Sequence, residues 1–141
     1  MKSINIIYWS GTGNTEMMAK AIEVGASEEG AEVKVKQVGE ASLDDIKNPD
    51  VVVLGCPAMG AEVLEEAEME PFIESISGEA QGKNIVLFGS YGWGDGEWMR
   101  NWEDKMKELG ANLIFDSLII NETPDDAAID ECKNLGRNLA K

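Results

Sequence analysis

The regular alternation of short apolar runs with amphipathic segments constrains the fold most strongly. Strands are expected at residues 4–9, 32–38, 51–55, 85–89 and 113–120. Helices are expected at residues 14–27, 71–77, 95–109 and 125–141. Because parallel strands need crossover connections, this alternation predicts a parallel sheet with helices on both faces.

The polarity of each run indicates its place in the sheet. Residues 4–9, 51–55 and 85–89 are almost continuously apolar, which is typical of central strands that are buried on both faces. Residues 32–38 alternate and fit an edge strand, and residues 113–120 are interrupted by two polar residues and fit the other edge. The sequence therefore predicts an α/β fold, a three-layer doubly wound five-stranded parallel sheet of order 2-1-3-4-5. Its ligand crevice is expected at the carboxyl ends of the first and third strands.

Length and charge limit the organisation and the partners. The 141 residues fit one domain, 1–141. With 27 Asp and Glu against 12 Lys and Arg, the net charge of -15 disfavours nucleic acid and anionic lipid and favours basic protein partners. No apolar run approaches the ~20 residues that cross a bilayer, and no signal peptide is evident. We therefore expect no membrane association and a cytoplasmic location.

The histidine and cysteine content limits the catalytic and metal-binding chemistry that the chain can support. The chain has no histidine, and Cys56 and Cys132 lie far apart without forming a CxxC motif. The commonest general base and the usual zinc ligands are therefore missing, so no metal site is predicted. The composition weighs against hydrolases and transferases and favours a bound cofactor as the carrier of chemistry.

The loop after the first strand has the features of an anion site. Two glycines permit close backbone approach, and hydroxyl and amide side chains surround them where a helix begins. The expected ligand is a phosphate monoester, held without Lys or Arg. The residues of this loop are Ser10, Gly11, Thr12, Gly13, Asn14 and Thr15.

Two other phosphate motifs do not match this loop. A P-loop requires a lysine after its last glycine, whereas Gly13 is followed by Asn14 and Thr15. A dinucleotide fingerprint requires a third glycine where Glu16 stands. The remaining alternative is a polar turn with a helix cap.

Three motifs carry a resemblance to a known family. The loop at 10–15, the segment Met59-Gly60-Ala61-Glu62 and the segment at 89–94, Gly-Ser-Tyr-Gly-Trp-Gly, are similar to those of flavodoxins. The similarity extends in order and spacing over nearly the whole chain. It is closest to the short-chain type found in anaerobic bacteria.

The resemblance implies a function. Such a protein is a low-potential one-electron carrier with non-covalent FMN. It cycles chiefly between neutral semiquinone and anionic hydroquinone, and it has no substrate turnover of its own. The partners implied are basic-surfaced redox proteins, either reductases or electron-accepting enzymes, and the carrier is expected to be a monomer.

The resemblance also implies roles for two further loops. Met59 and Trp93 are expected on opposite faces of the isoalloxazine ring. Glu62 is expected to accept a hydrogen bond from the flavin N3–H, and the N–H groups of Gly92 and Gly94 to reach the N1/O2 edge. The expected cofactor-binding residues beyond the first loop are Pro57, Ala58, Met59, Gly60, Ala61, Glu62, Ser90, Tyr91, Gly92, Trp93 and Gly94.

Gly60 has the most specific expected role. In the family, the peptide after this glycine turns over on one-electron reduction, and its carbonyl then accepts from the flavin N5–H. Ala61 follows where many relatives carry Asp, Asn or Gly, and Pro57 replaces a common Ser or Thr. Carboxylates near the ring loops are expected to lower the potential for the second electron by about 100 mV or more. They are Glu62, Glu65, Glu66, Glu68, Glu70 and Asp95.

Two other classes of protein remain as alternatives. An enzyme of the same fold, such as an NAD(P)H-dependent quinone or flavin reductase, needs a nicotinamide site, for which the sequence shows no segment. A flavin-free signalling domain needs acidic residues where Ser10, Gly11, Cys56 and Pro57 stand.

Overall fold

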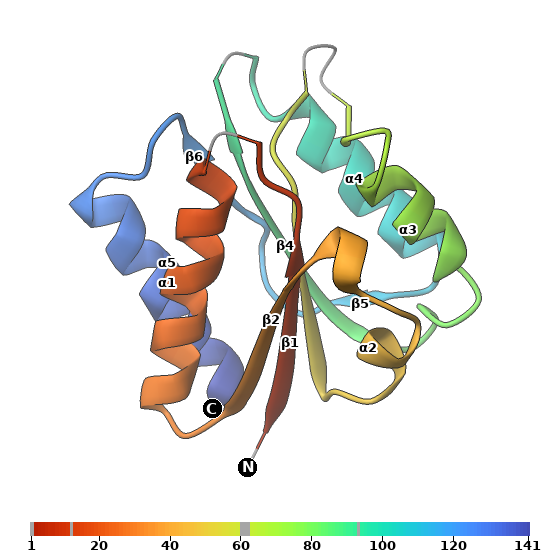
Figure 1. Cartoon of the computed structure of the whole chain (residues 1–141), viewed down its shortest axis with the longest axis horizontal. Helices are drawn as coiled ribbons and strands as arrows, with labels where there is room; N and C mark the ends of the chain where they lie inside the picture. The colour runs from red at the N-terminus through yellow and green to blue at the C-terminus, as the bar shows by residue number, and fades with distance from the viewer. Residues whose placement is uncertain (1, 12, 60–62, 93) are drawn as a thin grey trace.

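A central parallel sheet separates two layers of helices in the computed structural model, which describes residues 2–11, 13–59, 63–92 and 94–141 (Figure 1). The strands are β1 (Ser3–Tyr8), β2 (Glu32–Gln37), β3 (Val51–Gly55), β4 (Asn84–Tyr91), β5 (Asn112–Leu113) and β6 (Leu118–Asn121). The helices are α1 (Asn14–Glu28), α2 (Asp44–Lys47), α3 (Met69–Ser75), α4 (Glu97–Glu108) and α5 (Asp126–Ala140), with a 3-10 turn, η1, at Val38–Glu40.

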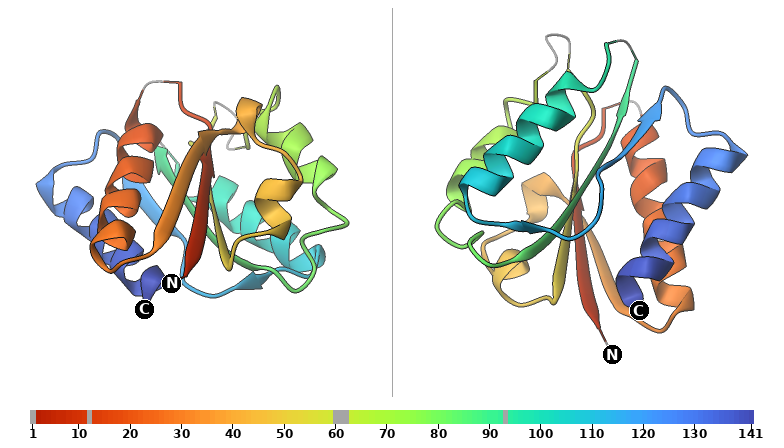
Figure 2. Two further views of the ribbon diagram at one scale, coloured as in Figure 1. Left: turned by 60° about the horizontal axis from the view of Figure 1, so that its bottom comes forward. Right: turned by 180° about the vertical axis from the view of Figure 1, so that it is seen from behind.

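The strand order confirms the predicted topology. The strands run β2-β1-β3-β4-β5, and β6 also pairs with β4, with every pairing parallel. The fifth position is shared by two short strands, so the sheet has six strands where five were predicted. β5 pairs with the start of β4 and β6 with its end, because the segment 114–117, which contains Asp116 and Ser117, interrupts the pairing. Both lie along one edge of β4 in the rear view of Figure 2.

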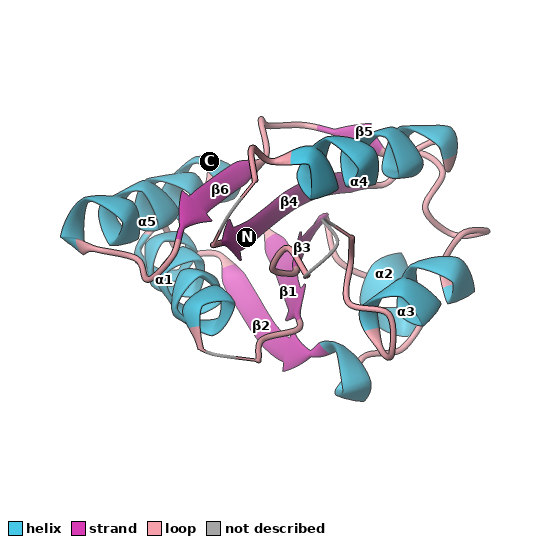
Figure 3. Cartoon of the chain, turned by 90° about the horizontal axis from the view of Figure 1, so that it is seen from above, coloured by secondary structure: helices cyan, strands magenta, loops and turns pink. Residues whose placement is uncertain are grey.

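Each face of the sheet carries its own helical layer. Helices α1 and α5 cover one face, and α2, α3 and α4 cover the other (Figures 1 and 3). The side chains of β3 are buried along its whole length, whereas those of β2 alternate between exposed and half-buried. The interpretation of β3 as central and β2 as an edge strand is therefore confirmed.

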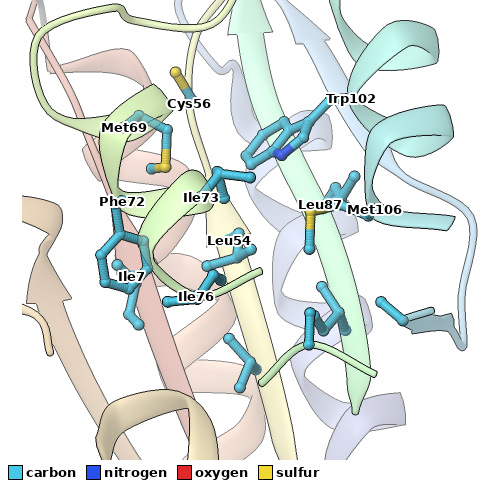
Figure 4. Close-up of a cluster of buried hydrophobic side chains, with 14 of the residues drawn as sticks. Ile7, Leu54, Cys56, Met69, Phe72, Ile73, Ile76, Leu87, Trp102 and Met106 are labelled. Atoms are coloured by element: carbon cyan, nitrogen blue, oxygen red, sulfur yellow. The ribbon is translucent and has the colours of Figure 1, made fainter. Parts of the chain in front are cut away.

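The amphipathic helices turn their apolar faces into these two cores. Met18, Ile22 and Ala26 of α1 are fully buried against one face. Trp102 and Met106 of α4 lie beside Ile73 and Leu87 on the other (Figure 4). Within the described residues, every helix is too short or too polar to span a bilayer.

Helices α1 and α5 approach each other at two glycines. A Cβ at Gly25 would lie 1.9 Å from the carbonyl oxygen of Lys133, and one at Gly136 would lie 2.1 Å from that of Ile22. Both obstacles are backbone atoms of the facing helix, so a side-chain rotation cannot relieve the clash. The two glycines therefore set the spacing of this helix pair.

The segment between β2 and β3 contains structure that the sequence did not reveal. Helix α2 begins after Ser42, whose N–H donates to Asp45 Oδ2 at 2.8 Å. The carbonyl oxygen of Asp45 accepts from Asn5 Nδ2 at 3.0 Å. This hydrogen bond explains the polar residue within the apolar run of β1, because Asn5 is buried and satisfies a helix carbonyl.

The carboxyl group of Asp45 has a lowered pKa. Burial of its carboxyl group would raise the pKa, but the Ser42 N–H and the Lys36 ammonium outweigh it and hold the pKa below its ordinary value. Lys36 Nζ lies 3.0 Å from Asp45 Oδ1. The ion pair therefore joins β2 to α2.

Replacing Lys36 with methionine should make the free energy of unfolding depend less on pH in the acidic range. The pKa of Asp45 is lowered in the folded state, so its stabilisation is present at neutral pH and is lost as pH falls through that lowered pKa. With the Lys36 side chain 38% exposed, solvent screening limits the loss in K36M to about 0.5–1 kcal/mol at pH ~7.

Urea unfolding from neutral to strongly acidic pH measures this difference. Lys34 lies two residues earlier on β2 and has no ion pair among the described residues, so Lys34→Met is the matched control. A K36M deficit that stayed constant down to the lowest pH would contradict this account of Asp45.

Candidate functional site

A crevice of about 320 Å³ opens at the carboxyl ends of β1, β3 and β4. These strand ends lie at the top of Figure 1. This is where the winding of the sheet reverses, between β1 and β3. The chain therefore has its crevice where the topology predicted it. Its lining residues come from four loops: Trp9, Gly11, Asn14, Pro57, Ala58, Met59, Ser90, Tyr91, Gly92 and Glu122.

The first loop is shaped by Ser10 and Gly13. Ser10 Oγ accepts hydrogen bonds from the N–H groups of Gly13 at 3.1 Å and Glu16 at 3.3 Å. Gly13 caps α1 in a left-handed conformation with φ 100°, which favours glycine, and no side chain caps the helix at this position. Ser10 thus lies behind the loop and fixes its curvature.

The start of α1 supplies donors to the crevice. Among the described residues, no acceptor accompanies the backbone N–H groups of Asn14 and Thr15, and Asn14 lines the crevice. Unpaired N–H groups at the first turn of a helix attract an anion. These N–H groups are donors of the kind that the predicted phosphate site needs, and the site itself stays a prediction.

A buried hydrogen bond connects this loop to β4. Thr15 Oγ1 and Ser90 Oγ lie 2.9 Å apart, and both residues are nearly inaccessible to solvent. The bond holds the start of α1 at a fixed position beside the end of β4. Ser90 lines the crevice, while Thr15 supports it from behind.

The loop after β3 is held by backbone hydrogen bonds. The N–H of Cys56 donates to the carbonyl of Phe88 at 3.1 Å, and the N–H of Ala58 donates to that of Ser90 at 3.0 Å. The N–H of Met59 donates to the carbonyl of Val63 at 3.0 Å and closes the loop upon itself. Pro57, Ala58 and Met59 thereby form one wall of the crevice.

Glu65 has a structural role that the sequence did not reveal. Its carboxylate is buried and accepts from the N–H groups of Ala67, Glu68 and Met69. Glu65 therefore caps the start of α3, and its expected contribution to the charge near the ring loops stays a prediction. The cap also explains why α3 begins at Met69, two residues before the predicted start.

The loop after β4 forms the opposite wall. Tyr91 and Gly92 line the crevice, whereas Gly94 is exposed, with φ 87°, and is absent from its lining. Asp95 lies 2.9 Å from Arg100 Nη2, and this guanidinium lowers the pKa of the Asp95 carboxyl. The charge of Asp95 is thus partly offset by a cation.

Two wall residues were not among the predicted set. Trp9 follows β1 directly, and its indole packs against Gly11, where an added Cβ would come within 3.0 Å of the ring. Glu122 follows β6 with φ 58°, and its N–H donates to the carbonyl of Tyr91 at 2.6 Å. An aromatic residue at a strand end and an acidic residue after the last strand were the available signals.

Five predicted site residues lie outside the described part of the chain: Thr12, Gly60, Ala61, Glu62 and Trp93. Their roles stay predictions. Of the others, eight line the crevice: Gly11, Asn14, Pro57, Ala58, Met59, Ser90, Tyr91 and Gly92.

The two cysteines are buried free thiols. Burial raises the pKa of both Cys56 and Cys132 to about 12. Because the thiolate is the reactive form, neither residue offers cysteine chemistry at neutral pH.

The crevice combines two chemical environments. N–H donors and hydroxyl groups gather at the α1 end, and Met59, Tyr91 and Trp9 supply thioether and aromatic surface. Its volume is within the ~300–1,000 Å³ of small-ligand sites. A phosphate ester that carries a flat aromatic system fits this donor set and this surface.

Fold and crevice together define a doubly wound α/β protein of flavodoxin-like topology with a ligand site at the switch point. The chain belongs to the flavodoxin family, whose family model, described as Flavodoxin, matches residues 6–136. It is an FMN-binding electron carrier rather than an enzyme.

Relatives from anaerobic bacteria support this assignment. The chain is 49% identical to a flavodoxin of Clostridium beijerinckii over 137 residues, covering 97% of this chain and 99% of the relative. It is 47% identical to a flavodoxin of Megasphaera elsdenii, covering 98% of each chain. The solution structure of the two-electron reduced Megasphaera protein matches with a TM-score of 0.89 at 46% identity, over 97% of this chain and 98% of that one.

Proposed function

We propose that the chain is a low-potential one-electron carrier, cycling chiefly between the neutral semiquinone and anionic hydroquinone of non-covalently bound FMN. The observation that supports this most is the crevice itself. It lies at the switch point, with free helix N–H groups at one end and apolar walls from two loops beside it. FMN supplies the redox chemistry, and the chain holds and orients it.

The binding roles follow from the placement of the donors. The phosphate is held by the segment 10–15, with Ser10 and Thr15 fixing its shape and the N–H groups of Asn14 and Thr15 as donors. The ring lies between the walls formed by 57–59 and 90–92. The predicted contacts of Thr12, Gly60, Ala61, Glu62, Trp93 and Gly94 complete the proposal.

Charge supports the low potential and the choice of partners. The chain carries a net charge of -15, and Glu66, Glu68 and Glu70 are exposed beside the loop after β3. A negative surface disfavours an anionic reduced flavin and attracts basic redox proteins, both less so at high salt. Reductases or electron-accepting enzymes with a basic surface are the partners proposed.

The proposal extends to the domain organisation, the cellular location and the oligomeric state. Residues 1–141 form a single domain, because both cores share one sheet. The strongly acidic composition and the buried free thiols are consistent with a cytoplasmic monomer.

An anaerobic reductive titration followed by visible absorbance tests the function. The oxidised flavin spectrum should give way to the long-wavelength band of a neutral semiquinone and then to hydroquinone. Direct bleaching in one step would contradict the proposal and favour a two-electron flavoenzyme of the same fold. A protein that takes up no FMN would contradict both.

A further inference from the structure

Trp98 lies where the two loops that form the crevice walls meet helix α4. It belongs to the first turn of α4 and is 1% exposed. Its indole Nε1–H donates to the carbonyl oxygen of Cys56 at 3.2 Å, directly before the wall segment 57–59. Its ring also contacts Tyr91 of the opposite wall, with centroids 5.6 Å apart and an interplanar angle of 43°.

The Cys56 carbonyl is closely packed where it faces β4. A Cβ at Gly89 would lie 2.1 Å from the Cys56 carbonyl oxygen and 3.2 Å from the Trp98 ring. Cys56 is further fixed by its N–H bond to Phe88, and its Sγ accepts from the N–H of Glu65 at 3.4 Å. The Cys56 peptide therefore has little freedom to move unless Trp98 moves with it.

Trp102 provides an internal comparison one turn later on the same helix. It is also 1% exposed, and its ring contributes to the same apolar cluster, as Figure 4 shows. Its Nε1–H has no acceptor among the described residues. The two tryptophans thus share helix, burial and size but differ in whether the indole N–H holds a loop.

We propose that Trp98 is a positioning residue that, beyond the hydrogen bond from Ala58 to Ser90 that joins the two crevice walls, sets their separation and thereby tunes the FMN potentials. It acts through the Cys56 carbonyl on one wall and through the Tyr91 ring on the other. The inference rests on the proposed function, because it assumes that FMN lies between these walls. A small change in wall separation alters the contacts of oxidised and reduced flavin unequally, since only those contacts that differ between the two states shift a potential.

Trp98→Phe and Trp102→Phe are the paired variants. Both remove one indole, but only W98F removes a hydrogen bond to a crevice loop. W98F should bind FMN about three- to tenfold more weakly than wild type. It should also shift at least one one-electron potential by ~30 mV, which corresponds to a threefold change in relative affinity. W102F should match wild type in FMN affinity and in both potentials, because the Trp102 indole N–H has no acceptor to lose among the described residues.

Urea unfolding of the two apoproteins separates the change in FMN affinity and potentials from a general loss of stability. Equal potentials and FMN affinities in W98F, W102F and wild type would overturn the inference, as would equal shifts in both variants. If wild type itself forms no semiquinone, the proposed function fails instead.

A second measurement covers the case in which W98F does not fold. In ¹⁵N-labelled wild type, the indole resonance of Trp98 should change position between redox states, because its acceptor belongs to a crevice loop. The resonance of Trp102 should change less. A Trp98 resonance that is insensitive to the redox state would overturn the inference.

Discussion

Gly136→Ala lowers the free energy of unfolding by about 2–3 kcal/mol in our account, although alanine is the better helix former. The added Cβ would lie 2.1 Å from the Ile22 carbonyl oxygen and 2.7 Å from the Ala26 nitrogen. Both are backbone atoms of α1, so the helices must separate and the core between them loosens. Helix propensity alone predicts the opposite sign, a gain of up to ~1 kcal/mol.

Gly78→Ala serves as the control for this prediction. Gly78 is exposed, and an added Cβ would meet nothing within 4 Å. The Gly78→Ala substitution should change the free energy of unfolding by no more than about 0.5 kcal/mol. Urea unfolding of the apoproteins measures both changes, and a G136A variant as stable as wild type would contradict the close packing of α1 against α5.

Riboflavin should bind the apoprotein roughly 10²–10⁴-fold more weakly than FMN. Removing the phosphate removes at least two hydrogen bonds from N–H donors to a charged acceptor, each worth about 1.5–3 kcal/mol. The sum of about 3–6 kcal/mol converts to this range at ~1.4 kcal/mol per tenfold. The donors concerned are the N–H groups at the start of α1, at Asn14 and Thr15. Flavin fluorescence titration of the apoprotein measures both dissociation constants.

A serine pair sharpens this comparison. Ser10→Ala removes the acceptor that holds the N–H groups of Gly13 and Glu16. It should therefore reduce the difference in affinity between FMN and riboflavin. Ser75→Ala removes a hydroxyl that donates to the Phe72 carbonyl on α3, away from the crevice. It should leave the difference in affinity between the two flavins unchanged. Equal affinity of wild type for the two flavins would refute the phosphate site.

The topology was readable from the sequence because burial leaves a pattern on each strand. The continuous apolar run of β3 and the alternation of β2 set the centre and one edge of the sheet. Polar residues at 116–117 predicted the interruption that separates β5 from β6. Helix α2 was missed, because four residues are too short to show a helical period and its stability depends on Asp45 and Asn5, which are distant in sequence.

The crevice was only partly readable from the sequence. The glycines and hydroxyls of the first loop indicate anion binding through their residue types and their place before a helix. The hydrogen bond between Thr15 and Ser90 joins residues 75 positions apart, which no local pattern records. Trp9 resembles any buried aromatic residue at a strand end, and Glu65 resembles any surface carboxylate, until their neighbours in space are known.

A map of backbone amide shifts on addition of FMN to ¹⁵N-labelled apoprotein tests the central claim, that FMN lies at the carboxyl ends of β1, β3 and β4. The largest changes should fall on Gly11, Asn14, Ala58 and Tyr91, which line the crevice. Residues of the polar hollow beside α2, among them Asp44 and Asn48, should be unaffected. Changes centred on that hollow, with the crevice amides unmoved, would contradict the account.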